Sequence, residues 1–226
     1  MSQASPPAAR QWRPRWLHLW LLGLVLLPCL WIWADPHTVA ASEAMLATPL
    51  SHTMAVVAGP FGKLDNQLAV LLGCFLAAWV WRGRRRAWQW LAVTLLCLLA
   101  TGIVVNVTKV TVRRVRPGPE PAAGALDDRP RTSFPSADVA SVFAIAMATL
   151  AFAPRASLLV FVVGGMVGEA RLCAGVHHFA DVWGSVLIST AVSAGVVRAW
   201  RRRQGASDCD GEGEPSRASP EGAEIT

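Results

Sequence analysis

The sequence contains no tyrosine and only two lysines, Lys63 and Lys109, and just 16% of its 226 residues are charged. The absence of tyrosine excludes a tyrosine nucleophile. The five cysteines show no paired spacing, which argues against a disulfide framework and against a zinc site. We therefore expect neither a metal nor any other cofactor.

Apolar residues are abundant where charged residues are few. Hydrophobic residues make up 53% of the chain and the mean hydropathy is +0.38, which is too apolar for a water-soluble domain of this length. A net charge of +6 would suggest nucleic acid in a soluble protein, but here the arginines cluster between apolar runs, where they report orientation in a bilayer. The composition therefore predicts an integral membrane protein surrounded by membrane lipids, and no nucleic-acid partner.

Apolar runs divide the chain into an all-α, polytopic bundle of six predicted transmembrane helices. A leader over residues 1–15 precedes this membrane domain of residues 16–203, and an acidic tail over 204–226 is predicted to be disordered. A cleaved signal peptide is the alternative for the first run, although its bulky end at Trp31 and Trp33 favours retention. Residues 35–65 are expected to form an interfacial helix and loop. The six runs are 16–34, 68–81, 88–107, 139–153, 157–167 and 182–200.

Short basic segments orient this bundle. With six spans, both termini fall on the same side as the basic turn 82–86, Arg155 and the basic segment 198–203, which the positive-inside bias makes cytoplasmic. The loop 108–135 and the stretch 171–181 then share the exoplasmic face, although this loop is itself rich in arginine. An anionic ligand would explain these cations on the unexpected side.

The stretch RLCAGVHHFAD, residues 171–181, is the predicted chemical centre. If His177 and Asp181 begin a helix, the carboxylate lies one turn along the same face and holds one imidazole nitrogen, leaving the other free to attack. Arg171 offers a planar donor fork suited to phosphate oxygens. Taken alone, this pattern also fits a metal site or a membrane-surface cluster.

Upstream residues strengthen the prediction of an anion site. Lys109 and Arg116 are two helical turns apart, with Arg113 on nearly the same stripe, so together they would form an anion clamp. Ser136 stands where the fourth helix is expected to start, and free backbone N–H groups there favour phosphate. The serine could equally be only a helix cap.

Together these segments resemble the tripartite signature of the type 2 phosphatidic acid phosphatase family, which is related to the vanadium haloperoxidases. That signature is a lysine, six residues and Arg-Pro; then Pro-Ser-Gly-His; then an arginine, five residues, histidine, three residues and aspartate. The first part reads KVTVRRVRP and is complete, and the third selects His177. The resemblance implies that His177 attacks phosphorus to give a phosphohistidine and that Asp181 orients it. It also implies a phosphate held by Lys109, Arg116, Ser136 and Arg171.

The second part departs from the family pattern, since it reads PSAD. Ala137 replaces glycine, and its N–H can still bind phosphate unless the site requires a positive φ. Asp138 stands where the family has the histidine that protonates the leaving group. Asp138 either acts as the acid itself, or is not needed because the leaving group is a phosphate, or impairs the enzyme. His178 could also replace the missing proton donor.

We therefore expect a membrane lipid phosphatase that acts on a lipid phosphate or diphosphate, with polyprenyl diphosphate favoured. A lipid phosphotransferase using the same phosphohistidine and a non-catalytic lipid-phosphate binding protein are the alternatives. The preference for arginine over lysine is typical of a GC-rich bacterial genome, so we expect a bacterial inner membrane with a periplasmic site. A eukaryotic endomembrane with a lumenal site has the same topology.

Overall fold

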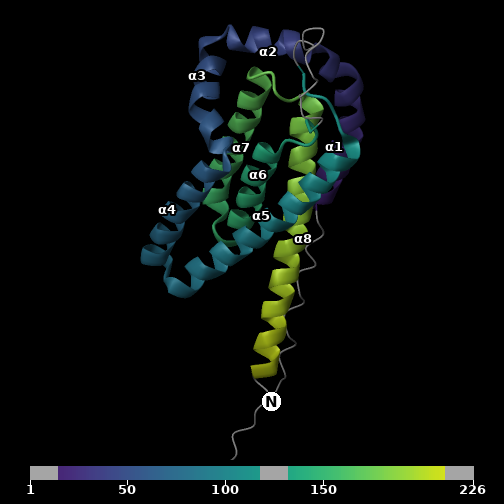
Figure 1. Cartoon of the computed structure of the whole chain (residues 1–226). Helices are drawn as coiled ribbons and strands as arrows, with labels where there is room; N and C mark the ends of the chain where they lie inside the picture. The colour runs from purple at the N-terminus through teal and green to yellow at the C-terminus, as the bar shows by residue number, and fades with distance from the viewer. Residues whose placement is uncertain (1–14, 118–131, 212–226) are drawn as a thin grey trace, which may run out of the picture.

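The computed structural model describes residues 15–117 and 132–211, and every regular element within these residues is helical (Figure 1). The predicted all-α class is therefore confirmed. Short π and 3-10 turns, η1 to η3, connect the α-helices near the N-terminus. In chain order the elements are α1 (Arg15–Cys29), η1 (Leu30–Ala34), η2 (Asp35–His37), α2 (Thr38–Leu46), α3 (Pro49–Ala58), η3 (Gly59–Gly62), α4 (Leu64–Arg82), α5 (Arg84–Val112), α6 (Ala137–Phe152), α7 (Pro154–Cys173) and α8 (Phe179–Gly211).

Five helical segments among the described residues are long and apolar enough to cross a membrane. The remaining predicted span is α6, whose 16 residues extend over only about 24 Å. A count of six spans and a cytoplasmic position for both termini remain predictions. Helix α8 runs to Gly211, past the expected boundary at 204. The leader up to residue 14, loop residues 118–131 and the tail from 212 lie outside the described residues. The five segments that are long and apolar enough to cross a membrane are Leu17–Leu46, Leu64–Arg82, Arg84–Val112, Pro154–Cys173 and Phe179–Gln204.

Helix α6 occupies the centre of the bundle, where it packs against α5, α7 and α8. Its contact face is built from small residues, and Ala140 and Ala144 are almost fully buried. Helix α8 likewise carries small buried residues, Ser185, Ser189 and Ser193, which are spaced four residues apart and have no exposed surface. Small side chains let helices approach closely, which is the usual basis of helix association in a membrane. This packing fixes the start of α6 against the start of α8.

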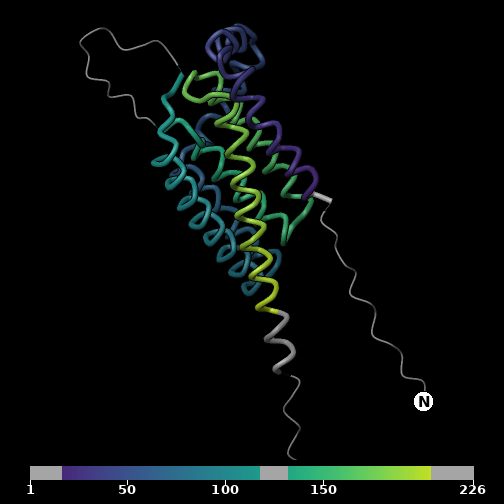
Figure 2. Tube along the Cα trace, turned by 90° about the vertical axis from the view of Figure 1, so that its right-hand side faces the viewer, coloured from purple at the N-terminus to yellow at the C-terminus, as the bar shows by residue number. Residues whose placement is uncertain are grey.

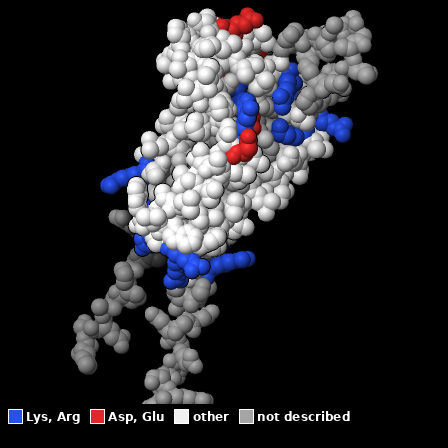
Figure 3. All heavy atoms as spheres, turned by 60° about the vertical axis from the view of Figure 1, so that its left-hand side comes forward, with Lys and Arg blue, Asp and Glu red and all other residues white. Residues whose placement is uncertain are grey.

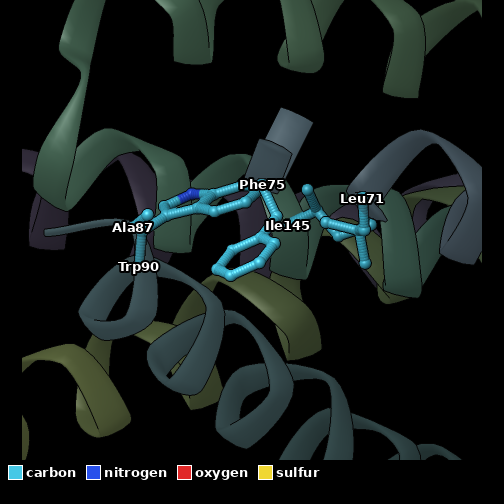
Figure 4. Close-up of a cluster of buried hydrophobic side chains, with 5 residues drawn as sticks. All are labelled: Leu71, Phe75, Ala87, Trp90 and Ile145. Atoms are coloured by element: carbon cyan, nitrogen blue, oxygen red, sulfur yellow. The ribbon is translucent and has the colours of Figure 1, made fainter. Parts of the chain in front are cut away.

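Helices α4 and α5 form a pair that joins the bundle through one apolar cluster. They are connected at Gly83, whose φ of +83° permits the sharp reversal within the basic turn 82–86. Figure 4 shows the side chains of this cluster pointing toward one another from α4, α5 and α6. The cluster consists of Leu71, Phe75, Ala87, Trp90 and Ile145.

The first predicted span and the segment 35–65 cover one side and one end of the bundle. Helix α1 lies along α8, as both views show (Figures 1 and 2). Helix α2 crosses the top of the view in Figure 1, and both α2 and α3 contact α7. The expected interfacial helix and loop is thus a pair of short helices, which brings the N-terminal part of the chain to the end where α7 stops and α8 starts.

Charged side chains differ between the two ends of the molecule. In Figure 3, acidic side chains lie beside Lys and Arg in the upper part, whereas only Lys and Arg appear at the lower end. The upper part is the end at which α5 and α7 finish and α6 and α8 begin. The chemistry-bearing motifs therefore gather at this end.

Candidate active site

Asp181 lies in the first turn of α8 with its side chain fully buried, and two histidine rings approach it. His177 Nδ1 is 3.6 Å from Asp181 Oδ2, and His178 Nδ1 is 3.2 Å from the same oxygen. Helix α8 begins only at Phe179, so the prediction that His177 and Asp181 share one helical face is wrong. Their pairing forms instead across the turn that precedes the helix.

Further donors fix the Asp181 carboxylate. Oδ2 accepts from the His178 backbone N–H at 2.8 Å, as a carboxylate at the third helical position does in a capping box, and the Ser133 hydroxyl donates to the same oxygen. Arg114 Nη1 donates to Oδ1 at 2.8 Å. Both oxygens of this carboxylate are therefore occupied, and its orientation beside His177 is set by three separate segments.

The cations after α5 do not form the predicted helical stripe. Helix α5 ends at Val112 because Arg113 adopts a left-handed conformation with a φ of +49°, so the residues that follow leave the helix axis. Arg113 is exposed and its Nε donates to the Val110 carbonyl at 3.2 Å, which turns it away from the site. The shared face predicted for Lys109, Arg113 and Arg116 is therefore wrong.

Lys109 and Arg116 nevertheless remain neighbours. Lys109 Nζ donates to the Thr132 carbonyl at 2.8 Å, and its ammonium interacts electrostatically with Arg116, Asp138 and Asp181. These interactions place the end of α5 against the start of both α6 and α8. The lysine thus reaches the candidate site without a continuous helix.

Ser136 directly precedes α6, as predicted, but it does not act as a side-chain cap. Its backbone N–H lies 3.4 Å from the Asp181 carbonyl, and its hydroxyl is buried without a hydrogen-bond partner among the described residues. Ala137 is the first residue of α6 and has a helical, negative φ. The replacement of glycine by Ala137 therefore introduces no strain in this backbone.

Asp138 and Arg171 join the start of α6 to the end of α7. Asp138 Oδ2 forms an ion pair with Arg171 Nε at 2.9 Å, and Arg171 Nη2 donates to the Gly59 carbonyl at 3.1 Å. Gly62 in η3 lies so close that a Cβ atom there would stand 2.6 Å from Arg171 Nη2. The guanidinium is thus held between α6 and η3.

Four of the predicted site residues carry a buried polar atom with no hydrogen-bond partner among the described residues: Arg116 Nε, Ser136 Oγ, Arg171 Nε, which faces Asp138 in an ion pair, and His177 Nδ1, which faces Asp181. Buried polar groups are ordinarily satisfied, so unpaired donors gathered around one end of a bundle are typical of a binding site. Their chemistry suits a phosphate group, which offers several acceptor oxygens to arginine and hydroxyl donors. Within residues 15–117 and 132–211 there is no cluster of three metal-ligating side chains.

Sequence reasoning missed three residues that the structure places at this site. Arg114 and Ser133 both donate to Asp181, and Asp35 pairs with the second terminal nitrogen of Arg114. Arg114 was visible within the RRVR run, but nothing distinguished it from Arg113. Asp35 follows the first apolar run by one residue and gave no signal, because its contact depends on how α1 packs.

Solved structures show the same fold. A transmembrane PAP2-type phosphatidylglycerolphosphate phosphatase from Bacillus subtilis is 20% identical, with a TM-score of 0.58 over 83% of this chain and 96% of its own. LpxE from Aquifex aeolicus is 21% identical, with a TM-score of 0.53 over 71% of this chain and 94% of its own. A comparison with curated proteins finds no match.

The apolar helices of spanning length, together with this fold, identify an integral membrane protein. The segment that holds α5 through α8 up to residue 205 carries the three motifs and most of the site described above. Residues 90–205, just over half of the chain, match the PAP2 superfamily, and the chain therefore belongs to that superfamily.

Proposed function

We propose that this protein is a membrane lipid phosphatase in which His177 attacks phosphorus. The observation that carries the proposal is the buried His177–Asp181 pair among polar atoms that lack partners. Around it lie Lys109 at the end of α5, Arg116 just after that helix, and Arg171 at the end of α7. Both similar solved structures belong to the same fold, and one carries the name of a phosphatase. Binding alone would have no need of a histidine held beside a buried carboxylate.

In the proposed reaction His177 is neutral and carries its proton on Nδ1, directed at Asp181 Oδ2. A movement of about 0.6 Å shortens their 3.6 Å separation to hydrogen-bond length. The Nε2 lone pair then forms the N–P bond while the P–O bond to the leaving group breaks. Water later attacks phosphorus as the N–P bond breaks; the oxygen and protons of the water leave with the phosphate product, and the neutral imidazole is restored. Lys109, Arg116, Arg171 and the N–H groups at the start of α6 stabilise the phosphoryl oxygens.

The ion pair of Asp138 with Arg171 favours a diphosphate substrate. A carboxylate paired with a guanidinium is an acceptor and carries no proton for a leaving group. A lipid monophosphate ester needs that proton, because its leaving group is an alkoxide. Attack on the terminal phosphorus of a lipid diphosphate instead expels a lipid monophosphate anion, which leaves without a proton. We therefore propose a lipid diphosphate, with a polyprenyl chain favoured by the membrane setting.

Charge distribution supports an exoplasmic site. The basic turn 82–86, Arg155 at the start of α7 and the basic segment 201–203 lie at the ends of helices opposite to the candidate site. Under the positive-inside bias a basic end is expected on the cytoplasmic side, which supports our proposal of a periplasmic site in a bacterial inner membrane with both termini in the cytoplasm.

A phosphate-release panel tests the proposal on the purified full-length protein in detergent micelles. The substrates are a polyprenyl diphosphate and the monophosphate of the same chain, and the proteins are the wild type, His177→Ala, Asp138→His and the exposed control His52→Ala. We expect the wild type to prefer the diphosphate, His177→Ala to fall to background, and Asp138→His to raise monophosphate turnover.

Three outcomes decide between the alternatives. Equal turnover of both lipids by the wild type would overturn the diphosphate preference. Full activity in His177→Ala would overturn the nucleophile. Transfer of phosphate to a second lipid added to the assay, in place of release to water, would identify a phosphotransferase.

A further inference from the structure

The end of the first predicted span contacts the candidate site from outside the family match, which begins only at residue 90. Two indole hydrogen bonds fasten α1 to α8. Trp20 Nε1 donates to the Leu187 carbonyl and Trp183 Nε1 donates to the Gly23 carbonyl, both at 2.9 Å. This attachment brings the end of the span to the first turn of α8.

Asp35, at the end of the first span, lies against the first turn of α8, and its side chain is only 3% exposed. Its Oδ1 accepts from the Ala180 backbone N–H at 3.0 Å, and its Oδ2 accepts from Arg114 Nη2 at 2.6 Å. Ala180 directly precedes Asp181. The first turn of a helix has free N–H groups and favours negative charge, so a carboxylate from another segment satisfies both needs.

Arg114 connects this carboxylate to the one beside the histidines. Its Nη2 binds Asp35 and its Nη1 binds Asp181 Oδ1, while the face of the guanidinium stacks on Trp31 with Cζ 3.9 Å from the ring centroid. Only a planar fork presents two terminal donors in one plane and a flat face for an aromatic ring. A lysine could satisfy one of these three contacts well, but not all of them.

Arg114 fixes the orientation of the Asp181 carboxylate relative to the two histidine rings. Arg114 occupies Oδ1, so Oδ2 is the oxygen left for the Ser133 hydroxyl, the His178 N–H and the two imidazole rings. Without Arg114 the carboxylate would be held only through Oδ2, so the plane of the carboxylate and the angle at which Oδ2 faces the histidine rings would be less fixed. The orientation of the proposed nucleophile therefore depends on Arg114, which holds Asp181, and on Asp35, which holds Arg114.

We infer that Asp35, Arg114 and Trp31 are positioning residues for the proposed reaction, and that the end of the first span is thus a working part of the active site. This inference rests on the proposed function, because the three residues would act through His177. A role for Arg114 as a phosphate ligand fits less well, since both terminal nitrogens are already taken by carboxylates. One guanidinium between two carboxylates also leaves this group with net negative charge, which repels phosphate.

Steady-state kinetics of diphosphate hydrolysis test the inference with Asp35→Asn, Arg114→Lys and the double variant. Matched controls are the exposed Asp65→Asn and Arg155→Lys. A misplaced reacting group costs up to about a hundredfold in rate, so we expect kcat to fall about ten- to a hundredfold with KM within about twofold. Because both residues act through one contact, the double variant should be no slower than the slower single variant.

A second, milder variant keeps the test decisive if these proteins fold poorly. Trp31→Leu leaves both ion pairs in place; it removes the stacking face under Arg114 and the ring contact with Phe134, whose centroid is 5.5 Å away, from a residue that is already 38% exposed. We expect a loss of kcat of about threefold to tenfold with little change in KM, as the guanidinium becomes less rigid.

The outcomes separate this inference from the proposed function. A wild-type kcat in folded Asp35→Asn or Trp31→Leu, or a change in KM alone, would overturn the positioning role while an inactive His177→Ala still upheld the proposed function. Additive losses in the double variant would show two independent structural effects and would also overturn it. Activity in His177→Ala would instead remove the proposed function itself.

Discussion

Gly62 offers a direct way to displace Arg171 without changing any charged residue. A Cβ atom at Gly62 would stand 2.6 Å from Arg171 Nη2, 3.2 Å from its Nε and 3.1 Å from Val167 Cγ1. Ordinary van der Waals contact begins at 3.4 Å, so Gly62→Ala requires the guanidinium to move by about 0.8 Å or η3 to retreat by a similar amount.

Either movement strains the contacts that hold Arg171. The guanidinium has a hydrogen bond of 3.1 Å to the Gly59 carbonyl and an ion pair of 2.9 Å with Asp138, and a shift of this size disrupts at least one of them. Misplacement of a catalytic contact by about 1 Å can cost a hundredfold in rate. We therefore expect kcat/KM for the diphosphate substrate to fall about ten- to a hundredfold.

The assay is phosphate release over a range of substrate concentrations, together with thermal unfolding in detergent. Gly165→Ala is the matched control, because Gly165 lies on the same helix as Arg171 and an added Cβ there meets nothing within 4 Å. If Gly62→Ala retains the activity of Gly165→Ala while both unfold at similar temperatures, then Arg171 either tolerates the shift or takes no part in phosphate binding. Such a result would refute this argument.

Three further predictions follow from other contacts. Ser133→Ala removes a buried donor to Asp181 worth about 1.5–3 kcal/mol, so kcat should fall about ten- to a hundredfold; unchanged kinetics would contradict the assigned contact. Gly184→Ala places a Cβ atom into the Phe134 ring and should destabilise the protein by about 1–3 kcal/mol, seen as a lower unfolding temperature. Phosphate release should persist in excess EDTA, because side-chain cations supply the positive charge; a loss restored by a divalent metal would count against this mechanism.

Local patterns in the sequence were sufficient to predict most of the helices and the three motif segments, which the structure brings to one end of the bundle. Apolar runs separated by short basic turns fix helix positions, and helices of similar length return the chain to one end. Ser136 and Arg171 follow from this reasoning, since each lies at the end of a run. The exact ends of helices were harder: Arg113 stops α5 through a left-handed conformation that an arginine gives no reason to expect.

Contacts between distant segments could not be predicted from one sequence. Asp35 and Asp181 are joined through Arg114 because α1 packs along α8, and no local pattern encodes that packing. The partner of Asp138 was likewise hidden, since the ion pair with Arg171 exists only because α6 begins where α7 ends. These are also the contacts that sharpen the proposed substrate and mechanism.

The most direct test of the account is to trap the covalent intermediate. The full-length protein is mixed with polyprenyl diphosphate labelled in its terminal phosphate, quenched during turnover, and assayed for protein-bound label and its stability to acid and base. The account predicts an acid-labile, base-stable label on the wild type and on His178→Ala, and none on His177→Ala. A wild type that turns over without label under rapid quenching, or a label that persists in His177→Ala, would contradict it.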